Sequence, residues 1–295
     1  MSQWLHNFPF IAQRHALLLL RLALAAVYAG HAVMRLVTPG YFSQIGGFLA
    51  GFGLPYGQAI AWLVTAFELI GAPLLLLDRG TRWVASGLFL ISAGSMLLVQ
   101  SHAGWWVAEY GDGGMEFSFV QCALCLFLAS QARTSHRAAQ PGSLQWHIAH
   151  FPYVKPQQGY AILRTALALF FMIHAASRFT EADYFKGLGI GLSEFGMPFA
   201  YQLGIAATCI ELVGGSLLIL NRFAKWVALG MFGISTVGIV FIHLKLGWFV
   251  GEFGNGGAEF SVMLCAICLA IAAIDRDSRS GKRAPSQPLT ESPVH

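Results

Sequence analysis

Residues 21–35 read RLALAAVYAGHAVMR, and this stretch decides the architecture of the chain. It is apolar except for Arg21, His31 and Arg35. Ionisable side chains are costly inside a bilayer and usually have a function there. The same pattern returns 143 residues later as RTALALFFMIHAASR, residues 164–178, with both arginines and the histidine in register. The chain therefore contains this helix twice.

The composition is that of an integral membrane protein. Of the 295 residues, 56% are hydrophobic and 11% are charged, whereas soluble domains carry about 25% charged residues. Several apolar runs approach the length that crosses a lipid bilayer. A soluble all-helical protein would need a larger core than this chain can supply. The basic residues lie in loops and tails rather than on one face, which argues against a nucleic-acid partner.

The internal repeat extends over most of the chain at a constant offset, without gaps. The ionisable pairs that share the offset include Arg21 and Arg164, His31 and His174, Arg35 and Arg178, Glu68 and Glu211, Glu109 and Glu252, and Glu116 and Glu259. So long a register indicates duplication and fusion of one module. It suggests that a homodimer became a single chain.

Each copy is predicted to contain four membrane spans, so the fold class is an all-α integral membrane protein. The spans are expected near 15–37, 58–77, 82–101 and 115–131, and near 159–178, 201–220, 225–244 and 258–274. The predicted divisions are a first module (1–131), a linker (132–158), a second module (159–274) and a disordered tail (275–295). We expect eight transmembrane helices, arranged as two parallel four-helix bundle repeats, because an even number of spans inserts both copies the same way.

Loop charges predict the orientation. Lys and Arg gather on the side that carries both termini and the linker, while most of the loop carboxylates lie on the other side. The positive-inside rule then places both termini in the cytoplasm. We expect a multi-pass protein of a bacterial inner membrane, with the linker 132–158 on the cytoplasmic side.

Three ionisable residues of each copy are candidate catalytic residues. They are Arg21, His31 and Glu68 in the first copy, and Arg164, His174 and Glu211 in the second. We expect each set to form a hydrogen-bonded cluster inside its own four-helix bundle, because a carboxylate in the membrane needs a partner or stays protonated. Such a cluster is either a clasp between the first two spans, or a proton-handling, quinone-facing site.

A glycine-rich motif begins the fourth span of each copy. Residues 111–117 read GDGGMEF and residues 254–260 read GNGGAEF. Glycines permit a tight turn, and the helix dipole favours a glutamate in the first turn, so Glu116 and Glu259 have a capping role in one interpretation. In the other they belong to an outer-face site that includes Arg35, His102 and Glu109. The candidate cofactor-binding residues are Arg35, Arg178, Glu116 and Glu259.

Two CxxC pairs lie within the fourth spans, Cys122 with Cys125 and Cys265 with Cys268. At this helical spacing each pair could hold a soft metal or form a strained disulfide. Cysteine is also a small packing residue in membrane helices. Zinc sites need further ligands, and since none is evident nearby we predict no metal site and favour packing.

The order of these motifs resembles the DoxX family of small four-span membrane proteins. The resemblance rests on an early arginine in the first span, HAVMR at 31–35, FGLP at 52–55, FELIG at 67–71 and the Gly-Gly-x-Glu start of the fourth span. It covers residues 15–131 and again 159–274. The second copy departs from the first where Lys245 replaces His102 and His243 replaces Gln100.

The resemblance implies a redox association, because DoxX and DoxD proteins are linked to a thiosulfate:quinone oxidoreductase and to membrane complexes of sulfur and oxidative-stress enzymes. We therefore expect a subunit that engages quinone and that has soluble or membrane redox partner proteins. The sequence has no CxxCH haem motif and no GxGxxG fingerprint, so it offers no obvious electron carrier of its own. The alternatives are a non-enzymatic subunit that anchors soluble redox proteins, or a small-solute transporter.

Overall fold

The computed structural model is all-helical over the residues that it describes. Those residues are 2–107, 113–132, 142–180, 189–190, 192–194, 196–254 and 256–280. The only β-type pairing among them is an isolated bridge between Gly251 and Gly254. The predicted helical class agrees with this structure.

The helices follow the sequence repeat. The first copy comprises α1 (Ser2–Asn7), α2 (Gln13–Val37), α3 (Tyr41–Gly51), α4 (Gly57–Leu76), α5 (Thr81–Leu98), η1 (Gln100–His102) and α6 (Glu116–Gln131). The linker contains α7 (Leu144–His150). The second copy comprises α8 (Pro156–Thr180), α10 (Ala200–Cys209), η2 (Ile210–Gly214), α11 (Gly215–Ile219), α12 (Ala224–Gly238), η3 (Ile239–His243), α13 (Leu244–Leu246) and α14 (Glu259–Arg279).

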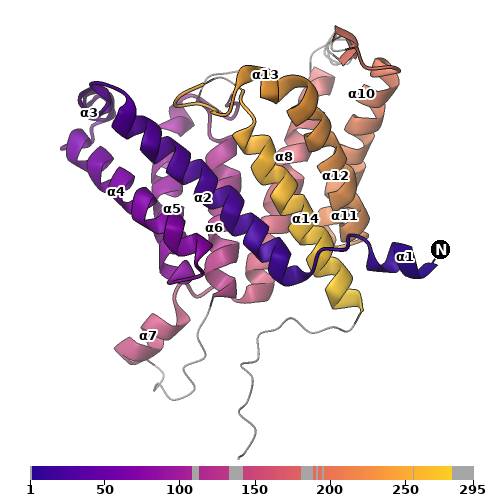
Figure 1. Ribbon diagram of the computed structural model, residues 1–295, viewed down its shortest axis with the longest axis horizontal. Helices are drawn as coiled ribbons and strands as arrows, with labels where there is room; N and C mark the ends of the chain where they lie inside the picture. The colour runs from indigo at the N-terminus through magenta and orange to yellow at the C-terminus, as the bar shows by residue number, and fades with distance from the viewer. Residues whose placement is uncertain are drawn as a thin grey trace, which may run out of the picture.

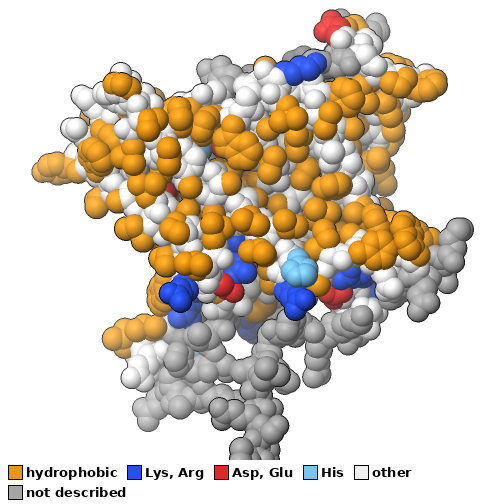
Figure 2. Space-filling view, viewed as in Figure 1, with side chains coloured by type: hydrophobic (Ala, Val, Ile, Leu, Met, Phe, Trp, Pro, Cys, Tyr) orange, Lys and Arg blue, Asp and Glu red, His pale blue; other side chains and the backbone are white. Residues whose placement is uncertain are grey.

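Six helical stretches in the described part of the chain are long and apolar enough to cross a membrane. They are Gln13–Val37, Gly57–Leu76, Thr81–His102, Pro156–Phe179, Ala200–Ile219 and Ala224–Leu246. The fourth helix of the first copy, α6, is apolar but shorter. Apolar side chains cover most of the visible surface, and Lys and Arg gather near its lower edge (Figure 2).

The two copies do not form separate bundles, because they exchange helices. α2 packs against α4 of its own copy and against α14 of the other, and α6 packs against α5 and α8 (Figure 1). Phe117 and Phe260, which are equivalent in the repeat, meet with ring centroids 4.7 Å apart. A contact between equivalent residues is the mark of a twofold-related interface. The fused chain therefore has the architecture of an interlocked dimer.

Short polar turns connect the second and third long helices of each copy. After α4, Asp78 adopts a φ of 54° and Gly80 a φ of 63°; Asn221 has a φ of 56° in the second copy. Asp and Asn tolerate this left-handed region better than most residues, and so the helix ends there. The Thr81 hydroxyl donates to the Asp78 carboxylate at 2.8 Å, which fixes the turn.

The second copy contains two π-helical segments that have no counterpart among the described residues of the first copy. η2 continues α10, and η3 continues α12. The equivalent helices α4 and α5 are α-helical throughout. π-helical turns widen a helix and are frequent at functional sites. The two copies therefore differ most in their second and third long helices.

Both described ends of the chain and the linker helix lie at the same pole of the molecule. α1, α7 and the C-terminal end of α14 lie at the lower end in Figure 1. α14 continues beyond Asp275 to Arg279, where we had predicted the start of a disordered tail. Residues 133–141 of the linker and 281–295 of the tail lie outside the described residues.

Helix exchange predicts how a divided chain behaves. If the protein is expressed as two fragments divided in the linker between α6 and α7, we expect the fragments to co-purify in detergent. Each fragment alone lacks the partner of its first and last long helix, and we expect it to be degraded in cells. Size-exclusion chromatography and pull-down through a tag on one fragment measure this. Two fragments that elute separately and are stable alone would contradict the interlocked architecture.

Candidate functional site

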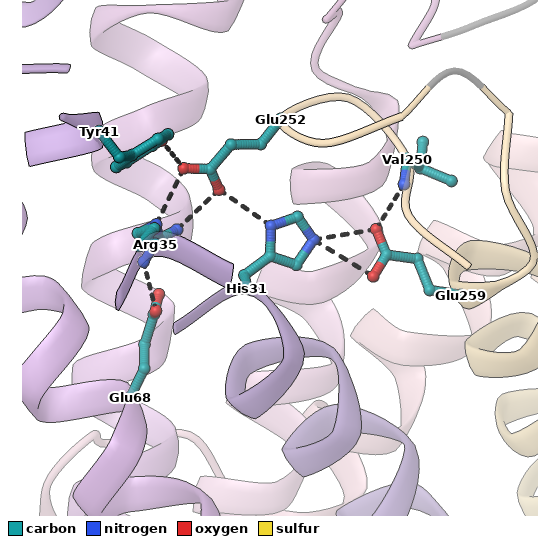
Figure 3. Close-up of polar contacts among 7 residues, drawn as sticks. All are labelled: His31, Arg35, Tyr41, Glu68, Val250, Glu252 and Glu259. Carbon is teal, nitrogen blue, oxygen red and sulfur yellow. Dashed lines mark hydrogen bonds and ion pairs between the residues drawn. The ribbon is translucent and has the colours of Figure 1, made fainter. Parts of the chain in front are cut away.

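His31 lies at the centre of the best-defined polar site, on α2. Its Nδ1 is 2.9 Å from Glu252 and its Nε2 is 2.9 Å from Glu259 (Figure 3). Glu252 lies in the loop before α14 and Glu259 in the first turn of α14. Both carboxylates therefore come from the second copy, whereas the histidine comes from the first.

Arg35 extends this network by one helical turn. Its guanidinium donates two parallel hydrogen bonds to Glu252, at 2.8 and 2.9 Å, and a third to Glu68 on α4 at 2.5 Å. Bidentate arginine–carboxylate pairs are among the strongest charge-assisted hydrogen bonds. The Tyr41 hydroxyl, at the start of α3, also donates to Glu252. The arginine thus joins the second long helix of its own copy to the loop of the other.

The glycine-rich motif positions the buried glutamate of each copy. Gly256 has a φ of 81°, and a side chain at Gly257 would collide with the backbone of Trp248 and Phe249. The tight turn aims Glu259 at the preceding loop, where it accepts a hydrogen bond from the Val250 amide at 2.7 Å. Its partners are this loop and the histidine of the other copy, so the glutamate does more than cap its own helix.

The second copy repeats the contact with the roles exchanged. His174 on α8 lies 2.8 Å from Glu116 of α6, and Glu116 accepts a hydrogen bond from the Val107 amide at 2.9 Å. We call His31–Glu259 and His174–Glu116 the crossed His–Glu pairs. Arg178 forms an ion pair with Glu211 and donates to Thr208 at 2.9 Å. Glu109, the equivalent of Glu252, lies outside the described residues.

The expected cluster of Arg21, His31 and Glu68 is wrong. Arg21 pairs instead with Asp78, in the turn after α4. Arg21 and Arg35 are fourteen residues apart on α2, about 21 Å at 1.5 Å per residue, so the arginine that reaches Glu68 is Arg35. Asp78 follows directly after the second span in the sequence, and the antiparallel course of α2 and α4 places it beside Arg21.

The remaining predicted site residues have different surroundings. Arg164, equivalent to Arg21, donates to the Ile219 carbonyl at 3.3 Å, because Asn221 occupies the position of Asp78 in the second copy. Glu211 pairs with Arg178, as Glu68 pairs with Arg35. His102 packs against Phe52 with ring centroids 5.4 Å apart.

Electrostatics keep the loop carboxylate ionised. Burial alone would raise the pKa of Glu252, but hydrogen bonds from His31 and Arg35 outweigh it and lower the pKa to about 2. Both ring nitrogens of His31 face carboxylate oxygens. A neutral imidazole can donate from only one of them. The site consequently holds one further proton, either on the imidazole or on a carboxyl group. The arrangement can accept and release that proton.

Groups that could hold a ligand lie around the second of the crossed pairs. A cavity of about 440 Å³ borders His174, Arg178, Glu211 and Glu116. Among the residues described, no three His, Cys, Asp or Glu side chains are placed to hold a metal ion. All five cysteines are free thiols, and the two CxxC pairs pack within α6 and α14.

Removing a crossed partner should be more damaging than removing a surface ion pair. His31→Ala leaves Glu259, which is fully buried, without its charged partner, and breaking a buried pair costs about 3–5 kcal/mol. Asp78→Asn is the matched control. Asp78 is more than half exposed, although Arg21 is largely buried, and the amide oxygen of Asn can still accept from Arg21, so we expect a cost of about 1 kcal/mol. The free energy of unfolding, measured in mixed micelles, should fall more in His31→Ala than in Asp78→Asn. An equal loss for both variants would contradict the site.

The pH dependence of stability should report on Glu252. Its folded pKa lies below the ordinary value of about 4.3, so its contribution is complete above that value and is lost as pH falls towards 2. We expect wild type to be more stable than Glu252→Gln at pH 7 and the difference to shrink below about pH 4. Thermal unfolding in detergent from pH 7 to pH 3 measures the difference. A gap that stays constant over that range would refute the assignment.

Comparison with known proteins identifies one family. The DoxX family model matches residues 16–101 and again residues 159–244. The matched ranges stop before the glycine-rich motif and the fourth helix of each copy. No curated protein and no solved structure is significantly similar to the chain.

Proposed function

Because the chain belongs to the DoxX family of membrane proteins, we propose that it is a quinone-interacting subunit of a membrane oxidoreductase system in a sulfur or thiol redox context. The crossed His–Glu pairs are the observation that carries this proposal. Each joins a histidine and a buried glutamate of opposite copies, at 2.9 and 2.8 Å. Ionisable groups in the membrane interior are functional candidates by default.

Quinone chemistry needs such groups. Reduction of a quinone to a quinol takes up two electrons and two protons, and oxidation releases them. A histidine paired with a carboxylate can donate and accept a proton, and the described residues contain two such pairs. Arg35 and Arg178 lie one turn beyond the histidines and can donate hydrogen bonds to a quinone carbonyl.

The electrons must come from another protein in this proposal. The sequence carries no CxxCH and no GxGxxG motif, so the proposal assigns the electron carrier to a soluble or membrane partner. The chain then supplies the quinone contact and the proton-exchanging groups. This division of work is that of a subunit rather than a complete enzyme.

The proposal includes eight spans in parallel repeats, with both termini in the cytoplasm of a bacterial inner membrane. α6 and α14 are the fourth span of each copy in this topology. Two observations support it: α1, α7 and the end of α14 lie at one pole (Figure 1), and Lys and Arg gather near the same edge (Figure 2). Cytoplasmic loops are rich in Lys and Arg.

Isosteric substitution of the crossed glutamates tests the function. In Glu116→Gln/Glu259→Gln the side-chain oxygens can still accept from the Val107 and Val250 amides, but the proton-accepting carboxylates are gone. Without the carboxylates, His31 and His174 lose the anions that favour their charged form, and a charged donor contributes about 1.5–3 kcal/mol to a hydrogen bond with a quinone carbonyl. We therefore expect decylubiquinone to bind at least about tenfold more weakly. Titration of the purified protein in nanodiscs measures the Kd.

Asp78→Asn, at the opposite pole, is the control and should bind as wild type does. Equal quinone affinity in the double variant, or no binding by wild type, would defeat the proposal. If soluble oxidoreductases are captured by a protein that binds no quinone, the non-enzymatic anchoring role would be favoured instead.

A further inference from the structure

The second copy contains a cavity of about 440 Å³ that lies among α8, α10–η2, α12–η3 and α14. Ligand pockets typically have volumes of about 300–1,000 Å³ and mostly apolar walls with a few polar groups. This cavity fits that description, since Phe171, Ile210, Ile234 and Leu264 are among its lining residues. Two features need an explanation: which kind of molecule the cavity binds, and why the cavity lies in the second copy.

In the first copy, a polar cluster fills the equivalent interior. The Ser92 hydroxyl lies 2.5 Å from the Tyr28 hydroxyl and 3.5 Å from the Gln121 side-chain oxygen. All three side chains are buried. We call this cluster the polar plug. It satisfies its own hydrogen-bonding groups and joins α2, α5 and α6.

The second copy keeps the serine and loses both partners. Ser235 replaces Ser92, while Phe171 stands at the position of Tyr28 and Leu264 at that of Gln121. All three line the cavity. The Ser235 hydroxyl is buried and has no hydrogen-bond partner among the described residues. A buried polar atom without a partner destabilises the folded protein, so this position favours a ligand atom that can form the missing hydrogen bond.

Two further replacements open the wall that faces the bilayer. In the first copy, the ring of Phe67 on α4 packs against Gly87 on α5. A Cβ atom added to Gly87 would overlap the Phe67 ring. The smaller Ile210 takes the place of Phe67, and Gly233 takes that of Leu90. Gly233 is exposed and lines the cavity, with no atom within 4 Å of where its Cβ would be. The gap between α10 and α12 is therefore open at this point.

The π-helical segments belong to the same opening. Ile210 and Glu211 of η2, and Ile242 and His243 of η3, all line the cavity. α12 packs chiefly on α14, and within the second long helix it contacts η2 and α11 more than α10. The second and third long helices therefore contact each other at one end and diverge towards the other. The two π-helical segments therefore lie on the second and third long helices, which border the gap between α10 and α12.

The polar end of the cavity selects the head group of the ligand. Arg178 and Ser235 both line the cavity. The buried Nε of Arg178 and the Ser235 hydroxyl have no hydrogen-bond partner among the described residues, and each can donate to an oxygen atom of a ligand. The carboxylates of Glu116 and Glu211 line the same cavity, and they already pair with His174 and Arg178, so these pairs leave no positive charge to balance an anion such as a fatty acid. The chemistry therefore suits a neutral molecule with an oxygen acceptor.

We propose that the second copy alone binds a neutral, long-chain lipid-like molecule with a carbonyl or hydroxyl head group, which enters sideways from the bilayer between α10 and α12. The polar plug keeps the first copy closed. The inference deepens the proposed function and rests on it for the natural ligand, since an isoprenoid quinone is one molecule of this class.

A photoreactive hexadecanol with a diazirine in its chain is the probe that tests this. After irradiation of the full-length protein in nanodiscs, mass spectrometry of peptides should find label on α10–η2, α12–η3 and α14. Gly233→Leu restores the residue of the first copy and should reduce this labelling at least about tenfold. Phe171→Tyr/Leu264→Gln restores the polar plug and should do the same, which keeps the test decisive if one variant misfolds.

Leu90→Gly is the matched control, because it makes the corresponding change in the first copy but leaves Tyr28, Ser92 and Gln121 in place. It should bring no new label to α4 and α5. Equal labelling of both copies in wild type, or labelling that neither second-copy variant reduces, would overturn the inference.

Competition by decylubiquinone separates the two proposals. Displacement of the label supports both of them. Label that Gly233→Leu blocks but decylubiquinone does not displace would leave the lipid-binding cavity standing and defeat the quinone function. Quinone binding that is unchanged in Gly233→Leu would leave the function standing and defeat the cavity as its site.

Discussion

The structure depends on two buried carboxylates that find their partners in the opposite copy. Glu259 is completely buried and Glu116 nearly so. An isolated charge at such depth is unstable, and here a histidine and a backbone amide compensate for burial in each case. Because each histidine belongs to the other repeat, this requirement joins the copies. α2 packs on α14 and α6 packs on α8, so each of these helices also has a partner in the opposite copy.

The fused chain retains the geometry of a dimer while its copies diverge. The equivalent residues Phe117 and Phe260 still meet at the centre, as they would on a twofold axis. A homodimer must change both sites together, whereas a fused chain can change one. The second copy accordingly carries two π-helical segments and a cavity, while the first retains the hydrogen-bonded Tyr28–Ser92 pair. The interlocked contacts preserve the fold during that divergence.

Much of this architecture follows from the sequence, and the pairing of its polar residues does not. Composition and the repeat predict an apolar all-helical protein that contains one module twice, and the resemblance of its motifs identifies that module as DoxX-like. The periodicity also identifies His31, Arg35, Glu68 and Glu116 as unusual. A constant offset cannot tell whether a partner lies in the same copy or the other, so the sequence does not show that His31 meets Glu259. The predicted contact of Arg21 with Glu68 is wrong for another reason, since Arg21 lies at the far end of α2 beside Asp78. The π-helical segments have no distinct sequence pattern, and the importance of Ser235 appears only when its neighbours are compared with those of Ser92.

Double-mutant cycles in the full-length protein test the crossed arrangement most directly. Unfolding free energies of the single and double variants of His31→Ala with Glu259→Gln, and of His31→Ala with Glu116→Gln, give one coupling energy for each pair. Residues in contact couple by about 0.5–3 kcal/mol, while distant residues add within about 0.3–0.5 kcal/mol. The structure predicts coupling above about 1 kcal/mol between His31 and Glu259 and near-additivity between His31 and Glu116. The reverse result would mean that each copy forms its own bundle, and it would contradict the interlocked fold.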